Sequence, residues 1–211
     1  MITASGGLDV NHNDQESDEM KEKIKKELKS YGIMAIVALI LYMTGWHTYV
    51  ISFLQRGILA TGLMQPRTEQ PTADLPVPNL NIELEDANGQ VLNMQQFQGK
   101  VLFINLWATW CPPCLAEMPN IDQLYTDLEP EKDIVFLMLS TDQDFSKAVQ
   151  HVADKGFNFP VYQIRRNWPP ELNSSTLPTT FVIDKQGRLV LAHRGMAKYN
   201  TSDFKAYLRG L

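Results

Sequence analysis

The pattern of hydrophobic and polar side chains divides this chain into three parts. Residues 1 to about 20 are polar, acidic and poor in large hydrophobic side chains, a composition that predicts disorder. Residues 20–30 interleave five lysines with two glutamates. This run fits a short charged helix at a membrane surface and equally a solvated charged face. We therefore expect residues 1–30 to be a disordered, charged segment.

The second part, residues 32–54, contains no Asp, Glu, Lys or Arg. As a helix it would extend roughly 34 Å at about 1.5 Å per residue, enough to cross a hydrocarbon core of about 30 Å. We expect residues 31–54 to form one transmembrane anchor that contacts the lipid bilayer through residues 32–54. The alternative is a cleaved signal peptide, whose apolar core is shorter, about 7–15 residues, and follows a short basic region.

The charges on either side of this segment predict its orientation. Five lysines precede it, whereas only Arg56 and Arg67 follow closely. Positive charge favours the cytoplasmic side, so we expect a cytoplasmic N-terminus and a C-terminal domain outside, which in a bacterium means a single-pass protein of the inner membrane with a periplasmic domain. Residues 55–74 carry two glycines and two prolines and predict a juxtamembrane linker, whose first half could rest on the bilayer.

The third part, residues 75–211, alternates short apolar runs with helical spacing. Asn88-Gly89 between apolar runs predicts a β-hairpin. The periodicity predicts strands at 101–107, 134–139, 180–183 and 188–192, an extended piece at 160–164, and helices after residue 111, near 145–155 and at 201–208. We expect Gly156 to end the second of these helices and Thr201 or Ser202 to be the N-cap of the third. Strands alternating first with helices and later with a turn predict an α/β domain with a mixed central sheet flanked by helices.

A Cys-Pro-Pro-Cys motif interrupts this pattern where the strand 101–107 gives way to a helix. Cys111 and Cys114 are the only cysteines in the sequence. Cys111 would lie at the helix N-terminus, where free N–H groups and the helix dipole favour a thiolate. Pro112 and Pro113 fit a first helical turn but remove two N–H donors, which limits how far the pKa of Cys111 falls. We expect Cys111 to be the exposed nucleophile and Cys114 the shielded resolving thiol.

Composition excludes several function classes. A net charge of −5 with a pI near 5.4 provides no basic surface for nucleic acid. A structural zinc site needs four ligands, and neither a second CxxC nor a paired histidine motif is present. Leu115 stands where covalent haem attachment would need histidine. A thiolate module that handles copper or zinc, a purely structural disulfide and a peroxide-reducing enzyme remain as alternatives to disulfide exchange.

The segment WATWCPPCLAEMP, residues 107–119, resembles the active site of the thioredoxin superfamily and, through its Glu-Met-Pro, the TlpA/ResA-like membrane-anchored thiol:disulfide oxidoreductases. The resemblance covers about residues 75–211. It implies a thioredoxin-like fold with an extra N-terminal β-hairpin and a redox-active disulfide, and it implies no cofactor or metal. It also implies protein substrates with disulfides or dithiols, a membrane thiol carrier as electron donor, and a reductive role such as cytochrome c maturation.

The resemblance also assigns a role to Glu117, which follows Cys114 by one helical turn. It would tune the pKa values of the cysteines or relay a proton, whereas a solvated surface glutamate is the alternative. Thioredoxin places a buried acid six residues before its first cysteine, but Asn105 occupies that position here. Because an amide is not a base, any proton relay falls to Glu117 or to water.

Three further residues are implied to bind the partner. Pro178 matches the cis-proline that faces the two cysteines in this family, and it would present the backbone of Leu177 to an extended peptide. Trp110 is expected to face the partner and Trp107 to lie mainly in the core, although either side chain could serve packing alone.

Overall fold

The computed structural model describes residues 10–44, 46–62, 64–66 and 76–211, which fall into two compact units, Met1–His47 and Thr48–Leu211. The first unit contains a single helix, α1 (Val10–Met43). Residues 10–20 are therefore helical where we had expected disorder, because a helix that is nucleated once extends cooperatively into adjacent residues. Residues 1–9 lie outside the described part of the chain.

The charge-free stretch 32–54 is divided between two helices. α1 ends at Met43, and the next residue, Thr44, still donates its N–H and its hydroxyl to the carbonyl of Ile40, at 3.0 and 2.8 Å. A second helix, α2, then runs over Trp46–Ala60. The expectation of one continuous helix across this stretch is therefore wrong. Among the residues that the structure describes, no helix combines the length and the apolarity needed to cross a membrane.

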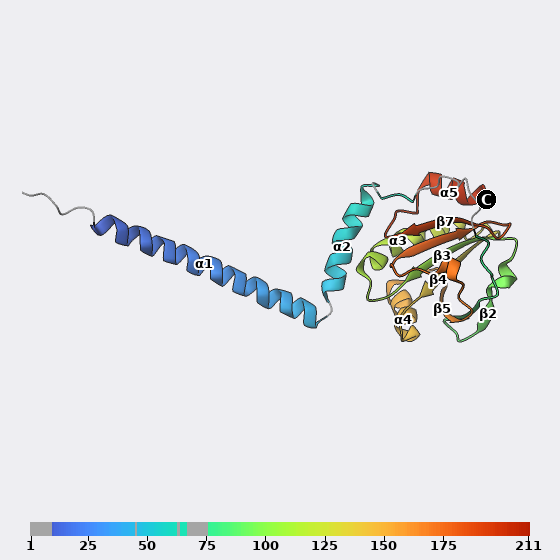
Figure 1. Cartoon of the computed structure of the whole chain (residues 1–211), viewed down its shortest axis with the longest axis horizontal. Helices are drawn as coiled ribbons and strands as arrows, with labels where there is room; N and C mark the ends of the chain where they lie inside the picture. Colours follow the sequence, from blue (N-terminus) through green and yellow to red (C-terminus); the bar gives the residue numbers. More distant parts are fainter. Residues whose placement is uncertain (1–9, 45, 63, 67–75) are drawn as a thin grey trace, which may run out of the picture. The chain divides into compact units, whose positions relative to one another are not determined.

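The second unit is built on one seven-stranded mixed sheet (Figure 1), which confirms the predicted architecture. The strand order is β2-β1-β5-β4-β3-β6-β7, and the central strand β3 is parallel to β4 and antiparallel to β6. The strands are β1 (Glu83–Asp86), β2 (Val91–Asn93), β3 (Val101–Trp107), β4 (Ile134–Ser140), β5 (Val161–Arg166), β6 (Thr179–Ile183) and β7 (Leu189–Arg194).

The predicted hairpin is present as β1 and β2, and β1 joins the sheet through β5. The extended piece expected at 160–164 is thus a full inner strand. Three helices of this unit follow strands, and two short 3-10 turns complete it. These elements are α3 (Pro112–Leu128), α4 (Phe145–Lys155), α5 (Ser202–Arg209), η1 (Met94–Phe97) and η2 (Pro170–Leu172).

Two helix ends follow the chemistry that the sequence predicted. Gly156 ends α4 in the left-handed conformation, with φ of 65°, which glycine adopts without a Cβ penalty. Thr201 caps α5 by accepting the N–H of Phe204 on its hydroxyl at 3.2 Å. The domain boundary expected at residue 75 and the linker residues 67–74 lie outside the described part, whereas residues 55–60 belong to α2 rather than to a linker.

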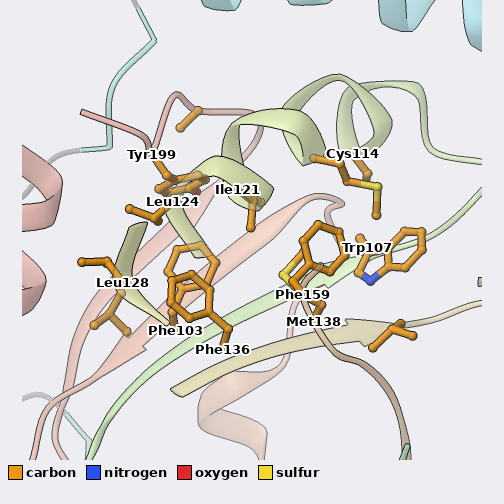
Figure 2. Packing of buried hydrophobic residues seen from close by; sticks show 14 of the residues in the cluster. Phe103, Trp107, Cys114, Ile121, Leu124, Leu128, Phe136, Met138, Phe159 and Tyr199 are labelled. Carbon is orange, nitrogen blue, oxygen red and sulfur yellow. The ribbon is translucent and has the colours of Figure 1, made fainter. Parts of the chain in front are cut away.

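All seven residues of β3 are buried, and they alternate between two hydrophobic clusters. Phe103 and Trp107 face the cluster that includes the buried side chains of α3 and α5 (Figure 2). The intervening residues Leu102 and Ile104 face the cluster shared with the hairpin. By this alternation Asn105 falls on the helix-facing side, so a polar amide lies in the core and requires hydrogen-bond partners there.

Candidate active site

The two cysteines lie where β3 passes into α3. Cys111 is the N-cap of α3 and forms a disulfide with Cys114, their Cα atoms lying 5.3 Å apart. The backbone N–H of Cys114 donates to Sγ of Cys111 at 3.3 Å. Because Pro112 and Pro113 occupy the first two helical positions, this is the one N–H that the first three residues of α3 can offer to the sulfur. The helix N-terminus therefore stabilises a thiolate less than it would in a chain without these prolines.

Cys111 is only 4% exposed and Cys114 is fully buried. The order of accessibility agrees with our expectation, but the expectation of Cys111 at the surface is wrong for the disulfide state. Both cysteines belong to the hydrophobic cluster with Trp107, so the sulfurs are covered by apolar side chains. Trp110, in contrast, is 62% exposed beside them, which leaves its ring available to a partner.

A hydrogen-bonded clamp fixes the loop just before Cys111. Thr109 donates its backbone N–H and its hydroxyl to the carboxylate of Asp142, at 3.0 and 2.7 Å. The hydroxyl of Ser140, the last residue of β4, donates to the same carboxylate at 2.8 Å. The parallel register of β3 and β4 brings these strand ends together. Sequence reasoning missed Asp142, although its place just after a strand parallel to β3 was a usable signal.

Glu117 is fully buried, so the alternative of a solvated surface glutamate is wrong. Its Oε1 accepts the side-chain N–H of Asn105 at 2.8 Å, and its Oε2 accepts the backbone N–H of Ala197 at 3.2 Å. Desolvation raises the pKa of Glu117 to about 8, against the lowering effect of these two hydrogen bonds. The carboxyl group therefore titrates in the same pH range as thiols, one helical turn from Cys114.

Two further polar side chains complete this buried group, and sequence reasoning missed both. The amide of Asn105 also donates to Oγ1 of Thr180 at 2.9 Å, since Thr180 pairs with Asn105 in the antiparallel register of β3 and β6. Tyr199 is fully buried, and desolvation together with the charge of Glu117 raises its pKa. A correct register between the two strands would have revealed Thr180, whereas no local pattern marks Tyr199.

The peptide bond between Leu177 and Pro178 is cis, as the resemblance implied. The sheet register pairs Thr179 with Leu106, so Pro178 lies at the end of β3 that leads to the cysteines. The carbonyl of Pro178 accepts the N–H of Gly195 at 2.8 Å. Leu177 is half-buried and packs against the cluster that contains both cysteines. The structure thus brings Leu177 and Pro178 to the redox pair.

The arrangement is suited to dithiol–disulfide exchange: two vicinal sulfurs of unequal accessibility, a buried acid that titrates near neutrality, and a backbone segment beside them. Within the described ranges, no group of three or more His, Cys, Asp or Glu side chains could hold a metal ion. The two sulfurs and the buried carboxyl group of Glu117 provide the groups that thiol–disulfide exchange uses.

Comparison with known proteins gives a family and a fold. The family model for Redoxin matches residues 72–208. The thiol-disulfide oxidoreductase ResA of Halalkalibacterium halodurans is 28% identical over 164 residues, which cover 77% of this chain and 84% of that protein. A solved structure of a thiol-disulfide oxidoreductase from Bacteroides vulgatus is 28% identical, with a TM-score of 0.53 over 66% of this chain and 99% of the other.

A solved structure of a thiol:disulfide interchange protein DsbE from Chlorobium tepidum is 22% identical, with a TM-score of 0.54, and covers 65% of this chain and 98% of that one. At this identity the likeness concerns the fold alone. These coverages correspond to the sheet and the helices packed on it, which confirms the thioredoxin-like fold of the second unit.

Proposed function

This chain belongs to the Redoxin family and is a thiol:disulfide oxidoreductase, and from that premise we propose that it exchanges disulfides with other proteins through Cys111 and Cys114. One observation carries the proposal: the two cysteines, unequal in exposure, stand at the N-terminus of α3 one turn from a buried glutamate whose pKa is raised to about 8. Sulfur pairs so placed act on disulfides rather than serve as structural cross-links.

In the reductive direction both cysteines begin as thiols. The thiolate of Cys111 attacks one sulfur of the partner's disulfide, forming a mixed disulfide and releasing the other partner sulfur as a thiolate. Cys114 then loses its proton and attacks Sγ of Cys111, which releases the second partner sulfur and closes the Cys111–Cys114 disulfide. Two electrons pass to the partner, and two protons complete its thiols.

Glu117 is our candidate acceptor for the proton of Cys114. A carboxyl group with a pKa of about 8 is largely neutral at pH 7, so the proton is accepted by its ionised fraction, which grows over the pH range in which a buried thiol begins to titrate. Its hydrogen bonds from Asn105 and Ala197 hold both carboxyl oxygens in place in either state. Glu117 thus acts as the base in this step, a role that the amide of Asn105 cannot fill.

The partner polypeptide is proposed to bind along Trp110, Leu177 and Pro178. The exposed ring of Trp110 offers an apolar contact. The backbone of Leu177 offers peptide groups for strand-like pairing with an extended segment. Such main-chain recognition suits an enzyme whose substrates share a disulfide rather than a sequence.

We further propose that the enzyme works outside the cytoplasm and is held at the inner membrane by the apolar stretch 32–54. The absence of charge over these residues and the five lysines before them support this placement. Electrons would come from a membrane thiol carrier and reduce substrate disulfides, such as those of apocytochrome c before haem attachment. These finer assignments follow from the resemblance to the TlpA/ResA-like proteins.

The experiment is a trapping assay with the full chain. Cys114→Ala should accumulate protein-linked mixed disulfides through Cys111 that are released by reductant, and the matched control Cys111→Ala should accumulate none. The wild-type pair should cycle reversibly in glutathione redox buffers. Absence of adducts together with absence of a reversible couple would exclude the proposed exchange. A topology reporter fused after Leu211 should be active outside the cytoplasm, and activity inside would refute the localisation alone.

A further inference from the structure

The helix α2 is docked beside the redox helix within the Thr48–Leu211 unit. The hydroxyl of Ser52 donates to the carbonyl of Pro112, the first of the two residues between the cysteines, at 2.9 Å. Leu59, two turns further, is 1% exposed and packs against Ala116 and Met196. α2 therefore runs along the N-terminal half of α3, although its residues 46–54 were expected in the membrane anchor and its residues 55–60 in the juxtamembrane linker.

In a third contact, α2 supplies a hydrogen-bond donor for a carbonyl of α3 that has no donor within its own helix. In an α-helix the carbonyl of Leu115 would accept the N–H of residue 119, but that residue is Pro119, which has none. The guanidinium of Arg56 supplies the missing donor, with Nη2 at 3.3 Å from this carbonyl. The docking is thus matched to a specific feature of the active-site helix.

An ordinary surface helix buries its apolar side chains and exposes its polar ones, whereas α2 exposes most of its large apolar side chains. On the docked face Ser52 and Leu59 are buried. Arg56, the only Asp, Glu, Lys or Arg of the helix, borders that face: it contacts α3 through Nη2 and remains exposed. The outer face is apolar and uncharged, and its large side chains are between 42% and 73% exposed. They are Val50, Ile51, Phe53, Leu54 and Ile58. A contiguous apolar face of this kind normally contacts something other than water.

We propose that this outer face of α2 lies in the acyl boundary of a lipid bilayer and thereby seats the active-site end of α3 at the membrane surface. The inference rests on the membrane attachment in the proposed function. Lipid is favoured because the face bears no charge and continues a sequence, residues 32–43, that also has none. The large apolar side chains of that part of α1 are exposed as well, Ile40 and Met43 among them.

The consequence concerns the partners. Because Ser52 and Arg56 fix α2 to the residues on either side of Cys114, a lipid-bound α2 holds the sulfurs at a constant, short distance from the headgroups. The redox pair would then react efficiently with thiols carried at the bilayer surface. Thiols in bulk solution would not benefit from this placement.

The test places a fluorescent label on α2 in the full chain, reconstituted in vesicles of phosphatidylcholine and phosphatidylglycerol. In a background with both cysteines changed to serine, Phe53→Cys or Ile58→Cys carries the label, and Lys147→Cys on exposed α4 is the matched control. Nitroxide-labelled lipid should quench the α2 labels at least about twofold and leave the control unchanged.

Unquenched α2 labels on a chain that stays with the vesicles would overturn the inference and leave attachment through the charge-free residues 32–43 of α1 intact. A chain that does not stay with the vesicles would refute the membrane attachment in the proposed function. If the labels are not quenched but their emission changes with protein concentration, the outer face of α2 contacts a second copy of the chain. That result would also overturn the inference.

A second measurement keeps the cysteines and so does not depend on the serine background. Phe53→Glu with Ile58→Glu should lower the rate of exchange with a dithiol tethered to a lipid headgroup by about tenfold, the range that effective concentration supplies. Exchange with soluble dithiothreitol should be unchanged, as should both rates in Lys147→Glu. Equal rates with the tethered dithiol in the variant and the wild type would contradict the proposal.

Discussion

Asn105 donates its side-chain N–H to the buried carboxyl of Glu117 at 2.8 Å and so links the central strand to the redox helix. Thioredoxin has an acid where this chain has Asn105. Here the acid is on the helix and the strand provides the amide that orients it. This arrangement still leaves one ionisable group, the carboxyl group of Glu117, in the core near the sulfurs. The amide of Asn105 holds that group by a hydrogen bond and does not itself titrate.

The raised pKa of Glu117 predicts a pH-dependent stability. Because its folded-state pKa of about 8 lies above the ordinary value of 4.5, its stabilising contribution is complete below about pH 4.5 and is lost as the pH rises toward 8. The scale is roughly 1.4 kcal/mol per pKa unit, so several kcal/mol are involved. Denaturant unfolding of the wild type should show this decline, and Glu117→Gln should flatten it.

The matched control is Glu171→Gln, which changes an exposed glutamate. It should retain the pH dependence of the wild type. Glu117→Gln should also slow the second step of exchange, resolution by Cys114, more than the first. If Glu117→Gln retained the pH dependence of stability of the wild type, the carboxyl group of Glu117 would already be ionised at neutral pH.

The prolines between the cysteines predict how the reactivity of Cys111 can be changed. Pro113→Ala restores an N–H at the second position of α3, next to the N–H of Cys114 that already reaches Sγ of Cys111. We expect the pKa of Cys111 in the reduced protein to fall, because another donor then faces the thiolate. Alkylation rates of the reduced protein as a function of pH measure the shift.

In the reduced wild type, Cys111 should alkylate much faster than Cys114, which is fully buried. Equal rates for the two cysteines would argue against the helix-terminus placement. An unchanged alkylation midpoint in Pro113→Ala would mean that the new N–H does not face the sulfur.

Local sequence patterns identified the parts of the fold that depend on neighbouring residues. Gly156 and Thr201 were expected as helix caps because their chemistry is decided within one turn, and both are caps. The Cys-Pro-Pro-Cys junction was found for the same reason. Asn105 was recognised as an unusual amide from its spacing to Cys111. Its partner Thr180 lies 75 positions away, and Ala197, which donates to Glu117, lies 80 positions from that glutamate, so neither contact could be read from the local sequence.

The largest difference concerns residues 46–60. The sequence pattern assigned Ser52 to the membrane anchor and Leu59 to the linker, and it could not show that the two residues share a docked face. On that face Arg56 donates to the carbonyl of Leu115, which Pro119, far along the chain, leaves without a helical donor. Periodicity alone would place the apolar side chains of α2 against the domain, and the structure exposes most of them instead.

The hydrogen bonds to the carboxylate of Asp142 predict that its removal lowers the free energy of unfolding and also raises the alkylation rate of Cys111. This carboxylate accepts two hydrogen bonds from Thr109 and one from Ser140. At about 0.5–1.5 kcal/mol for each bond, Asp142→Ala should lower the free energy of unfolding by about 2 kcal/mol. Asp142→Asn keeps one acceptor oxygen and should lose about half as much. Alkylation of reduced Cys111 should be faster in the alanine variant, and an unchanged rate would show that the clamp does not govern the loop.

The pairing of Arg56 with the carbonyl of Leu115 predicts a double-mutant cycle with Pro119. Arg56→Met should lower the free energy of unfolding by about 1 kcal/mol, because the carbonyl that Pro119 leaves free then has no protein donor. In the background of Pro119→Ala the same change should cost clearly less, since residue 119 now donates its own N–H. The coupling energy of the cycle, measured by denaturant unfolding, should therefore be several tenths of a kcal/mol or more. Additive losses would mean that Arg56 stabilises α2 by other contacts and that the proline does not determine where the helix docks.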